Sequence, residues 1–319
     1  PLLCLIFTKS LFWVVVFLIF IRVIVWYLYL LECFKINNDI KKRFKFEPAL
    51  IKPVLKLSGW MTVSNIVGPL ITYLDRFLIG AIISASAITY YATPYEVVTK
   101  LLLVPSAIIG VLFPVFSGSS SNNLEFSKKL LIRSTKYILL LLFPIVLLTT
   151  TFSYEVLHVW VGNKFAEHSS LVLQLLAIGV LLNSIAFVPF SFFQGIGRPD
   201  IPAKINLIEL PFYIAAMWFA VTVFGINGAA LVLVLLNVVN TIIQIYIVNK
   251  LVASTFEQKP GIFLFVFIGF ALVMPFVLSN IFLKIVFAAG MLLIFIFMTW
   301  RYFLHSDEKI FLTSLLKKM

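Results

Sequence analysis

The sequence predicts an all-α protein that crosses a membrane many times, and three observations lead to this fold class. Hydrophobic residues make up 62% of the 319-residue chain and charged residues only 12%, about half the charged fraction of a typical soluble domain. Apolar windows of about 20 residues, the length that one helical crossing requires, recur along nearly the whole chain. Basic residues collect in alternate connections between these windows, as they do in multi-span membrane proteins.

Nine apolar windows are predicted to form membrane-spanning helices. They cover residues 10–31, 57–83, 88–117, 134–156, 169–194, 203–224, 227–249, 261–282 and 284–303. Apart from the basic segment after the first window, the connections between them are short. We therefore expect no separate soluble domain.

The basic residues predict how these helices are oriented. The connections after the first, third, fifth and seventh windows and the C-terminal tail together hold 19 Lys and Arg, whereas the other four connections hold only Lys164 and Lys284. Cytoplasmic connections collect basic residues, so the C-terminus is predicted to be cytoplasmic. The same pattern accounts for most of the net charge of +12. Attraction of the basic connections to anionic inner-leaflet lipid reinforces it. Because the charge is explained in this way and no nucleic-acid-binding motif is present, we expect no nucleic-acid partner.

The first window must then run from outside to inside. The chain begins at Pro1 with no charged region ahead of this apolar stretch, which is therefore not a signal peptide. If the complete protein starts in the cytoplasm, an odd number of spans is missing upstream. We expect the chain to be the C-terminal part of a larger membrane protein.

The longest outward connection, residues 153–168, carries two carboxylates and two histidines: Glu155, His158, Glu167 and His168. They could form a metal or acid–base site, or they could be ordinary polar residues of a solvated loop. Their spacing matches no ligand motif, which favours the solvated loop. The sequence also lacks a nucleotide-binding P-loop, a G-x-S-x-G elbow and an H-E-x-x-H motif. We expect neither a cofactor nor a metal, and not an enzyme.

Five charged residues lie inside the first three windows, namely Arg22, Asp75, Arg76, Glu96 and Lys100. Each costs about 2.5–3.5 kcal/mol at the centre of an inserted helix. Charged side chains at this depth usually face protein or water rather than lipid. They are therefore candidates for the functional site.

Polar residues form a stripe along each of two consecutive windows. Their spacings of three and four place them on one helix face. The stripe in 57–83 contains Ser58, Thr62, Asn65, Thr72 and Arg76, and the stripe in 88–117 contains Thr89, Thr93, Glu96 and Lys100. Pro69, Pro105 and Pro114 are expected to bend these helices.

The rise of about 1.5 Å per residue places Arg76 and Glu96 at similar depth, so an ion pair between them is predicted. Lys100 and Arg22 lie deeper, which leaves net positive charge near mid-membrane. One interpretation is a water-filled cavity that offers cations to a phosphate or diphosphate in transit. The other is that polar stripes hold helices together. For Asp75, packing or snorkelling toward the outer interface is favoured.

Several stretches resemble a known family. The segments GWMTVSN (59–65), YLDRFLIG (73–80), YYATPYEVVTKL (90–101) and GVLFPVFS (110–117) resemble the first two helices of the second lobe in O-antigen flippases of the Wzx type. The segment QGIGRPD (194–200) resembles a cytoplasmic turn of the wider multidrug, oligosaccharidyl-lipid and polysaccharide exporter superfamily. In it Gly195 and Gly197 permit a sharp turn, Pro199 ends one helix and Asp200 can cap the next. Gly225–Gly228 is expected to make a tight outward turn in the same way.

The resemblance implies the C-terminal lobe of a MATE-like two-lobe transporter. Residues 1–31 would be the last helix of the N-terminal lobe, 32–56 a basic cytoplasmic linker, 57–249 the six-helix C-terminal lobe, and 250–319 two additional transmembrane helices and a cytoplasmic tail. Five preceding helices would be absent from this chain.

The implied activity is translocation of an undecaprenyl-diphosphate-linked oligosaccharide, an O-antigen or other surface polysaccharide repeat unit, across the bacterial cytoplasmic (inner) membrane by alternating access. The implied partners are this lipid-linked oligosaccharide, membrane lipids, and a polysaccharide polymerase with its chain-length machinery. Arg22, Arg76 and Lys100 would bear the charge and Glu96 would orient them. Polar cavity lining would come from Thr62, Asn65, Thr72, Asp75 and Thr93.

Three alternatives stay open. Tyr90, Tyr91 and Tyr95 could stack on sugar rings or form an aromatic belt at the membrane interface, and the belt is favoured. A multidrug exporter of the same superfamily would need a negatively charged cavity for cationic cargo. A membrane polysaccharide polymerase or glycosyltransferase would need acids or nucleophiles on a sizeable outer loop, which this chain lacks.

Overall fold

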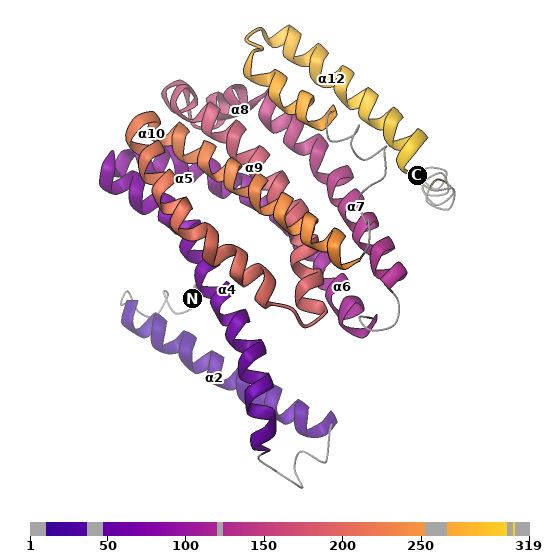
Figure 1. The fold of residues 1–319 in the computed structure, drawn as a ribbon. Helices are drawn as coiled ribbons and strands as arrows, with labels where there is room; N and C mark the ends of the chain where they lie inside the picture. Colours follow the sequence, from indigo (N-terminus) through magenta and orange to yellow (C-terminus); the bar gives the residue numbers. More distant parts are fainter. Residues whose placement is uncertain (1–10, 37–46, 120–123, 253–266, 305–308, 310–319) are drawn as a thin grey trace. The chain divides into compact units, whose positions relative to one another are not determined.

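The computed structural model describes residues 11–36, 47–119, 124–252, 267–304 and 309. These residues form helices joined by short turns, and none of them lies in a β-strand. The prediction of an all-α polytopic membrane protein is confirmed. The helices in chain order are α2 (Leu11–Ile36), α4 (Pro48–Ile82), α5 (Ala85–Thr99), α6 (Leu103–Ser119), α7 (Leu124–Thr151), α8 (Ser153–Trp160), α9 (Asn163–Gly195), α10 (Asp200–Leu251) and α12 (Ile281–Met298) (Figure 1).

The chain divides into two compact units, residues 1–55 and 56–319. The first contains α2, an apolar helix long enough to cross a membrane, and most of its side chains are exposed. The second contains the remaining helices and most of the core. Helix α4 begins in the first unit and continues into the second.

Seven described helices are long and apolar enough to span a membrane, with a further short apolar helix at Phe267–Phe276. The two windows predicted at 203–224 and 227–249 lie within the 52-residue α10, which departs from helical geometry at Gly225 (φ 63°, ψ −144°). This left-handed conformation suits glycine, so the expected turn at Gly225–Gly228 is confirmed. Part of the window at 261–282 lies outside the described residues.

The window at 88–117 is interrupted where the prolines predicted a bend. A short 3₁₀ segment, Lys100–Leu102, separates α5 from α6. Pro105 follows within one turn and has no backbone N–H, and in a regular α-helix its ring would clash with the carbonyl of residue 101, four positions earlier. The chain accommodates this clash by tightening into a 3₁₀ turn.

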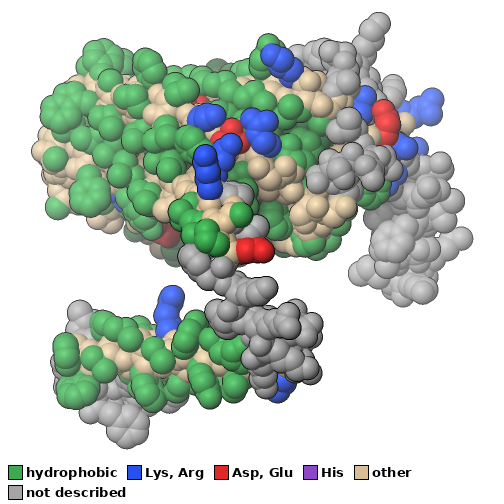
Figure 2. Space-filling view, turned by 60° about the horizontal axis from the view of Figure 1, so that its bottom comes forward, with side chains coloured by type: hydrophobic (Ala, Val, Ile, Leu, Met, Phe, Trp, Pro, Cys, Tyr) green, Lys and Arg blue, Asp and Glu red, His purple; other side chains and the backbone are tan. Residues whose placement is uncertain are grey.

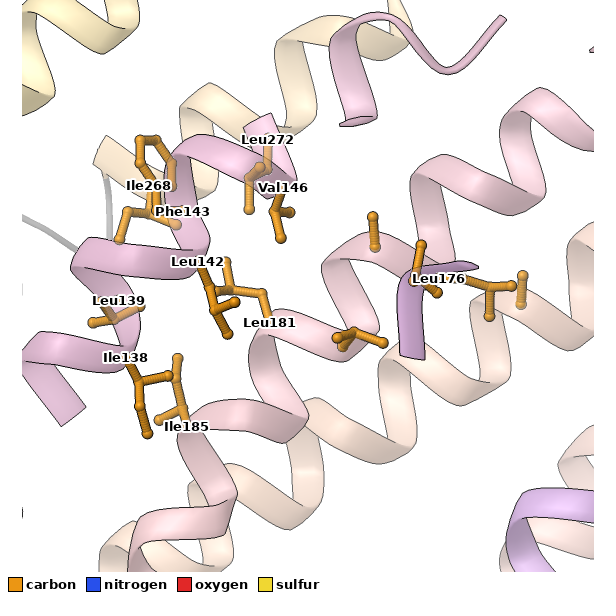
Figure 3. Packing of buried hydrophobic residues seen from close by; sticks show 14 of the residues in the cluster. Ile138, Leu139, Leu142, Phe143, Val146, Leu176, Leu181, Ile185, Ile268 and Leu272 are labelled. Atoms are coloured by element: carbon orange, nitrogen blue, oxygen red, sulfur yellow. The ribbon is translucent and has the colours of Figure 1, made fainter. Parts of the chain in front are cut away.

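Helix α9 lies at the centre of the second unit and contacts α5, α6, α7, α8 and α10. Figure 3 shows Leu181 of α9 beside Leu142 of α7 and Ile185 of α9 beside Ile138 of α7. These side chains are at most 2% exposed. Close van der Waals contact of this kind, rather than exclusion of water, holds helices together in lipid.

The connection at 153–168 is helical, so the expectation of a solvated loop is wrong. Helix α8 and the start of α9 occupy it, and Glu155 of α8 forms an ion pair with Lys284 of α12, with 2.8 Å between Nζ and Oε1. The Lys284 side chain is only 7% exposed. A buried charge needs such a partner, and this pair joins α12 to the bundle.

The turn at 195–200 forms as predicted, but Asp200, Pro199 and Gly195 act differently from expectation. Asp200 is the first residue of α10 rather than its cap, and Pro199 occupies the cap position without a side-chain hydrogen bond. Gly197 has the positive φ of 72°. Gly195 instead permits close packing, because a Cβ atom there would lie 2.6 Å from the Cβ of Phe116 in α6.

Candidate functional site

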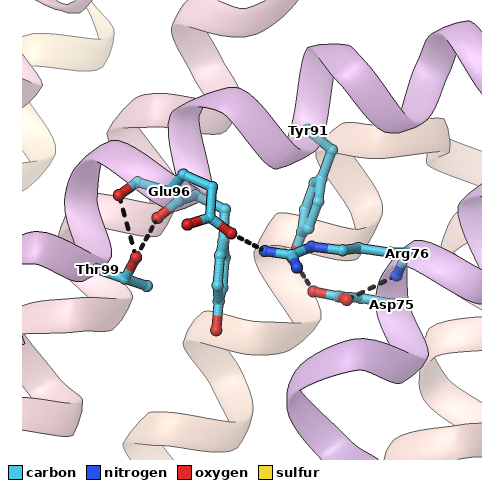
Figure 4. Close-up of polar contacts among 6 residues, drawn as sticks. Asp75, Arg76, Tyr91, Glu96 and Thr99 are labelled. Carbon is cyan, nitrogen blue, oxygen red and sulfur yellow. Dashed lines mark hydrogen bonds and ion pairs between the residues drawn. The ribbon is translucent and has the colours of Figure 1, made fainter. Parts of the chain in front are cut away.

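The predicted ion pair between Arg76 of α4 and Glu96 of α5 is confirmed. The Nη2 atom of Arg76 lies 3.0 Å from Oε1 of Glu96, and Figure 4 shows the two side chains extending toward each other from neighbouring helices. The guanidinium also lies over two aromatic rings, 4.8 Å from the Tyr95 centroid and 5.3 Å from that of Tyr73. These contacts hold the guanidinium in one place while Glu96 remains largely exposed, at 59%.

Asp75, the neighbour of Arg76, is fully buried, so the suggestion that it snorkels to the interface is wrong. Its Oδ2 accepts a hydrogen bond of 2.7 Å from the Tyr91 hydroxyl, and its Oδ1 accepts one of 2.6 Å from the Arg76 backbone N–H. Tyr91 is itself 0% exposed, so it lies neither in an aromatic belt nor against a bound sugar. This pair joins α4 to α5.

The other candidate residues of α4 and α5 lie on more open surface. Thr62 and Asn65 are exposed, Thr93 is half-buried, and Lys100 is exposed at the break after α5. Lys100 forms no ion pair with any described residue, and Glu96, one turn before it, pairs with Arg76. Arg22 belongs to the other unit and is exposed on α2.

A cavity of about 280 Å³ lies within the second unit between α4, α5, α9 and α10. Thr72 is the one predicted site residue among those that line it. Arg76, Glu96 and Lys100 do not line it, and none of its described lining residues is Lys or Arg. The lining comprises Gly68, Ile71, Thr72, Tyr95, Thr99, Leu102, Val180, Asn183, Ala186, Phe187, Phe190, Asn206, Glu209, Leu233, Leu236, Asn237, Asn240 and Gln244.

The polar wall of this cavity was not anticipated. Glu209 accepts a 2.7 Å hydrogen bond from Nδ2 of Asn240, and Oδ1 of Asn240 accepts one from Nε2 of Gln244. The signal was present in the sequence, because Asn237, Asn240 and Gln244 follow at steps of three and four and Asn206 and Glu209 are three apart. This is the same helical spacing that marked the stripes of α4 and α5.

The α9–α10 turn carries a charged cluster. Arg198 and Lys204 both bind Asp200, at 2.9 Å and 3.2 Å, and the Lys204 ammonium lies 5.3 Å from the Trp60 ring centroid. The hydrogen bond to Asp200 raises the pKa of the Arg198 guanidinium above its ordinary value. Figure 2 turns this end of the unit forward and shows Lys and Arg side chains gathered within a largely hydrophobic surface.

No group of three or more His, Cys, Asp and Glu side chains that could hold a metal ion occurs among the described residues. In particular, Glu155 is engaged by Lys284, and His158 stacks on Tyr154. The chemistry available in the described interior is therefore that of fixed charges, hydroxyls and carboxamides.

The fold defines a polytopic helical membrane protein with charged and polar side chains inside its bundle. The chain belongs to the family described as polysaccharide biosynthesis protein, whose model matches residues 4–170. This membership and the relatives below confirm the resemblance to Wzx-type flippases.

Three relatives are similar over much of this chain. A candidate O-antigen transporter of Shigella flexneri is 35% identical over 67% of this chain and 50% of its own length. A candidate low-salt glycan biosynthesis flippase of Haloferax volcanii, Agl15, is 26% identical over 70% of this chain and 47% of its own. The lipopolysaccharide biosynthesis protein WzxC of Escherichia coli K12 is 27% identical over 67% of this chain and 43% of its own length.

The chain spans about half the length of the curated relatives it matches. These relatives are named as transporters, flippases or biosynthesis proteins, and none carries the name of an enzyme. No solved structure matches the chain.

Proposed function

We propose that the protein containing this chain is a flippase that moves a lipid-linked oligosaccharide, a repeat unit of a surface polysaccharide on undecaprenyl diphosphate, from the inner to the outer leaflet. Family membership and the names of the relatives support the cargo class. The observation that carries the proposal is the Arg76–Glu96 ion pair between α4 and α5, with the exposed Lys100 one turn after Glu96.

The physical role of these cations is to replace water around a charged head group. A diphosphate that crosses hydrocarbon without partners is strongly disfavoured, and Arg and Lys at membrane depth offset part of that cost. Arg76 presents a planar fork that is held by Tyr95 and Glu96, whereas Lys100 offers a mobile point charge. The lipid tail can stay in the bilayer throughout.

In this proposal residues 57–249 form the six-helix C-terminal lobe, which rocks against an N-terminal lobe around the cargo. Residues 1–31 then supply the last N-terminal helix with Arg22, residues 32–56 the linker, and residues 250–319 the two additional helices and the tail. The distribution of basic residues supports an inner-membrane orientation with a cytoplasmic C-terminus. A polysaccharide polymerase with its chain-length machinery would take the translocated unit.

The test is replacement of Arg76 or Lys100 by Ala in a cell that depends on this protein for its surface polysaccharide. We expect each variant to abolish surface polysaccharide on gels while the protein still inserts in the membrane. Lys164→Ala, which removes an exposed cation at the start of α9, is the matched control and should leave the polysaccharide unchanged. Unchanged polysaccharide in both Arg76→Ala and Lys100→Ala would refute the role of these cations.

The charge swap of Arg76 and Glu96 tests the pair itself. Arg76→Glu or Glu96→Arg alone places like charges together, whereas the double replacement restores an ion pair. We expect partial recovery of surface polysaccharide in the double variant. If the double variant recovers no surface polysaccharide, the guanidinium is required at position 76 itself.

A further inference from the structure

Helix α4 is attached to the second unit unevenly along its length. Every α4 residue that belongs to the described core cluster, or packs against it, lies at Ile71 or later. The same part of α4 is fixed by the fully buried Asp75 and by the Arg76–Glu96 ion pair (Figure 4). By contrast, most side chains of residues 57–67 are exposed. These residues, the inner arm of α4, are therefore held less firmly than the rest of the helix.

A weak point in the helix follows the inner arm. Pro69 has no backbone N–H, so the carbonyl of Asn65 lacks its intrahelical partner. Gly68 precedes this proline, and the Thr72 hydroxyl donates a 3.0 Å hydrogen bond to the Gly68 carbonyl. Bonds from a Thr side chain to the carbonyl four residues earlier often bend helices, and proline is a common cause of sharp kinks. The inner arm therefore meets the fixed part of α4 at a place where the helix can bend.

A cation–π contact joins the inner arm to α10. The Lys204 ammonium lies 5.3 Å from the centroid of the Trp60 ring, and Asp200 binds the same ammonium at 3.2 Å. The Lys204 side chain is 56% exposed. A cation–π contact at an exposed site shifts an equilibrium by only about two- to fivefold. Such a contact can hold two helices together and still release them.

This contact lies on the cytoplasmic side of the cavity between α4, α5, α9 and α10. On α4, Trp60 precedes the lining residue Gly68 by eight residues, roughly 12 Å. On α10, Lys204 precedes the lining residue Asn206 by two, roughly 3 Å. The distribution of basic residues predicts that both helices start on the cytoplasmic side. Separation of the inner arm from α10 would therefore open the cavity toward the cytoplasm.

We propose that the inner arm is a gate that bends about Gly68–Pro69, and that the Trp60–Lys204 contact is the latch that closes it. A bend of about 20° away from α10 moves Trp60 by about 4 Å over its ~12 Å arm. The ring and the ammonium then lie beyond the ~6 Å range of cation–π attraction. Arg76 stays in place, because it belongs to the fixed part of α4. The gate is a property of this bundle and does not depend on which cargo is carried.

Distances between pairs of spin labels test the gate in the full-length protein, reconstituted in nanodiscs and without other cysteines. Leu57→Cys with Leu251→Cys reports on the inner arm, and Phe77→Cys with Val159→Cys reports on the fixed part of α4. All four positions are exposed. We expect the inner pair to show a second distance about 6 Å longer than the first, as a bend of about 20° produces over the 11 residues from Leu57 to Gly68. The outer pair should show one distance.

Breaking the latch should favour the longer distance of the inner pair. We expect Trp60→Leu and Lys204→Gln each to raise the open-to-closed ratio about two- to fivefold, and Lys204→Arg, which keeps the cation, to leave it unchanged. Trp218→Leu and Lys164→Gln are the matched controls, because they remove an exposed ring and an exposed cation that do not line the cavity. Both controls should behave like the parent.

Pro69→Ala tests the hinge separately from the latch. It restores a donor to the Asn65 carbonyl, so the straight helix gains one hydrogen bond. Combined with Trp60→Leu, it should lower the population of the longer distance roughly twofold or more. If the longer distance keeps its population, the bend does not lie at Gly68–Pro69 and the gate as proposed is wrong.

Chemical access to the cavity provides an independent measurement. Asn206→Cys places a thiol in the cavity lining of α10. A water-soluble maleimide should react with this thiol about two- to fivefold faster when the chain also carries Trp60→Leu. Equal rates with Trp60→Leu and with the control Trp218→Leu would contradict the opening of the cavity.

Three spin-label results would overturn the gate or its latch. The first is an inner-pair distance that is the same in the parent, Trp60→Leu and Lys204→Gln. The second is equal broadening of the outer pair, because that indicates general loosening of the bundle rather than a bend. The third is a shift in Trp60→Leu but not in Lys204→Gln, because Trp60 then acts as an anchor at the membrane interface and not as the partner of Lys204.

Discussion

At the scale of single residues, two adjacent charged residues of α4 bind different partners on α5. Asp75 points into the bundle and binds the Tyr91 hydroxyl, whereas Arg76 reaches Glu96 at the edge. Consecutive residues on a helix are about 100° apart, since one turn holds 3.6 residues, so adjacent charges can face different surroundings. Asp75 therefore belongs to the packing of α4 on α5, and Arg76 to the candidate transport surface.

The buried hydrogen bond of Asp75 leads to a stability prediction. Tyr91→Phe removes the donor and leaves Oδ2 of Asp75 buried without it, so we expect a loss of about 1–3 kcal/mol in the free energy of unfolding. Tyr90→Phe is the control. It keeps the ring that contacts Phe165 and His168 and the backbone carbonyl that accepts from the Ser169 hydroxyl, so it should change stability by less than about 0.5 kcal/mol. Denaturant unfolding in detergent measures both, and equal losses would contradict the role of the Asp75 bond.

At the scale of helices, α9 organises the second unit. It contacts five other α-helices and packs against α6 at Gly195, beside Phe116. The Phe116 ring in turn lies edge-on to Phe192 of α9, with 5.4 Å between centroids. A small residue on one helix and a large ring on the other thus bring two membrane helices together without a hydrophobic driving force.

Gly195→Ala is predicted to separate α6 from α9. The new methyl group would lie 2.6 Å from the Phe116 Cβ and 3.4 Å from its backbone carbon, neither of which can move without the helix. We expect destabilisation of about 1–3 kcal/mol by thermal unfolding in detergent. Gly110→Ala, where no atom lies within 4 Å, should be neutral or stabilise by up to about 1 kcal/mol through helix propensity. Equal unfolding temperatures for Gly195→Ala and Gly110→Ala would contradict the close packing of α6 on α9 at Gly195.

At the scale of the whole molecule, the two ends of α9 should lie on opposite sides of the membrane. Its 33 residues span about 50 Å, more than the ~30 Å hydrocarbon core. The exposed Val159 lies just before its start, whereas the exposed Lys204 follows its end by a short turn. The distribution of basic residues places the Lys204 side in the cytoplasm.

Cysteine labelling of whole cells tests this orientation in a variant without the native cysteines. A membrane-impermeant maleimide should label Val159→Cys in intact cells and Lys204→Cys only after permeabilisation. Labelling in the reverse order would invert the proposed topology and place the α9–α10 turn outside. Insertion of both variants is checked by their recovery in the membrane fraction.

Sequence alone determined those features that depend on position along one helix. Hydropathy located the spans, because a crossing has a minimum length, and the glycines located the turns at 195–200 and 225–228. Helical rise and spacing also paired Arg76 with Glu96, since both lie at similar distances from the turn that joins their helices. Pro105 marked the place where a long helix breaks.

Only the tertiary structure decided which polar residues meet across helices distant in the chain. Glu209 and Asn240 are 31 residues apart, and Glu155 and Lys284 are 129 apart. Periodicity shows that each residue lies on a polar face but not which faces meet, because that depends on how the shapes of all neighbouring side chains fit together. The same fit buried Asp75 and formed a cavity whose described lining includes none of the predicted cations.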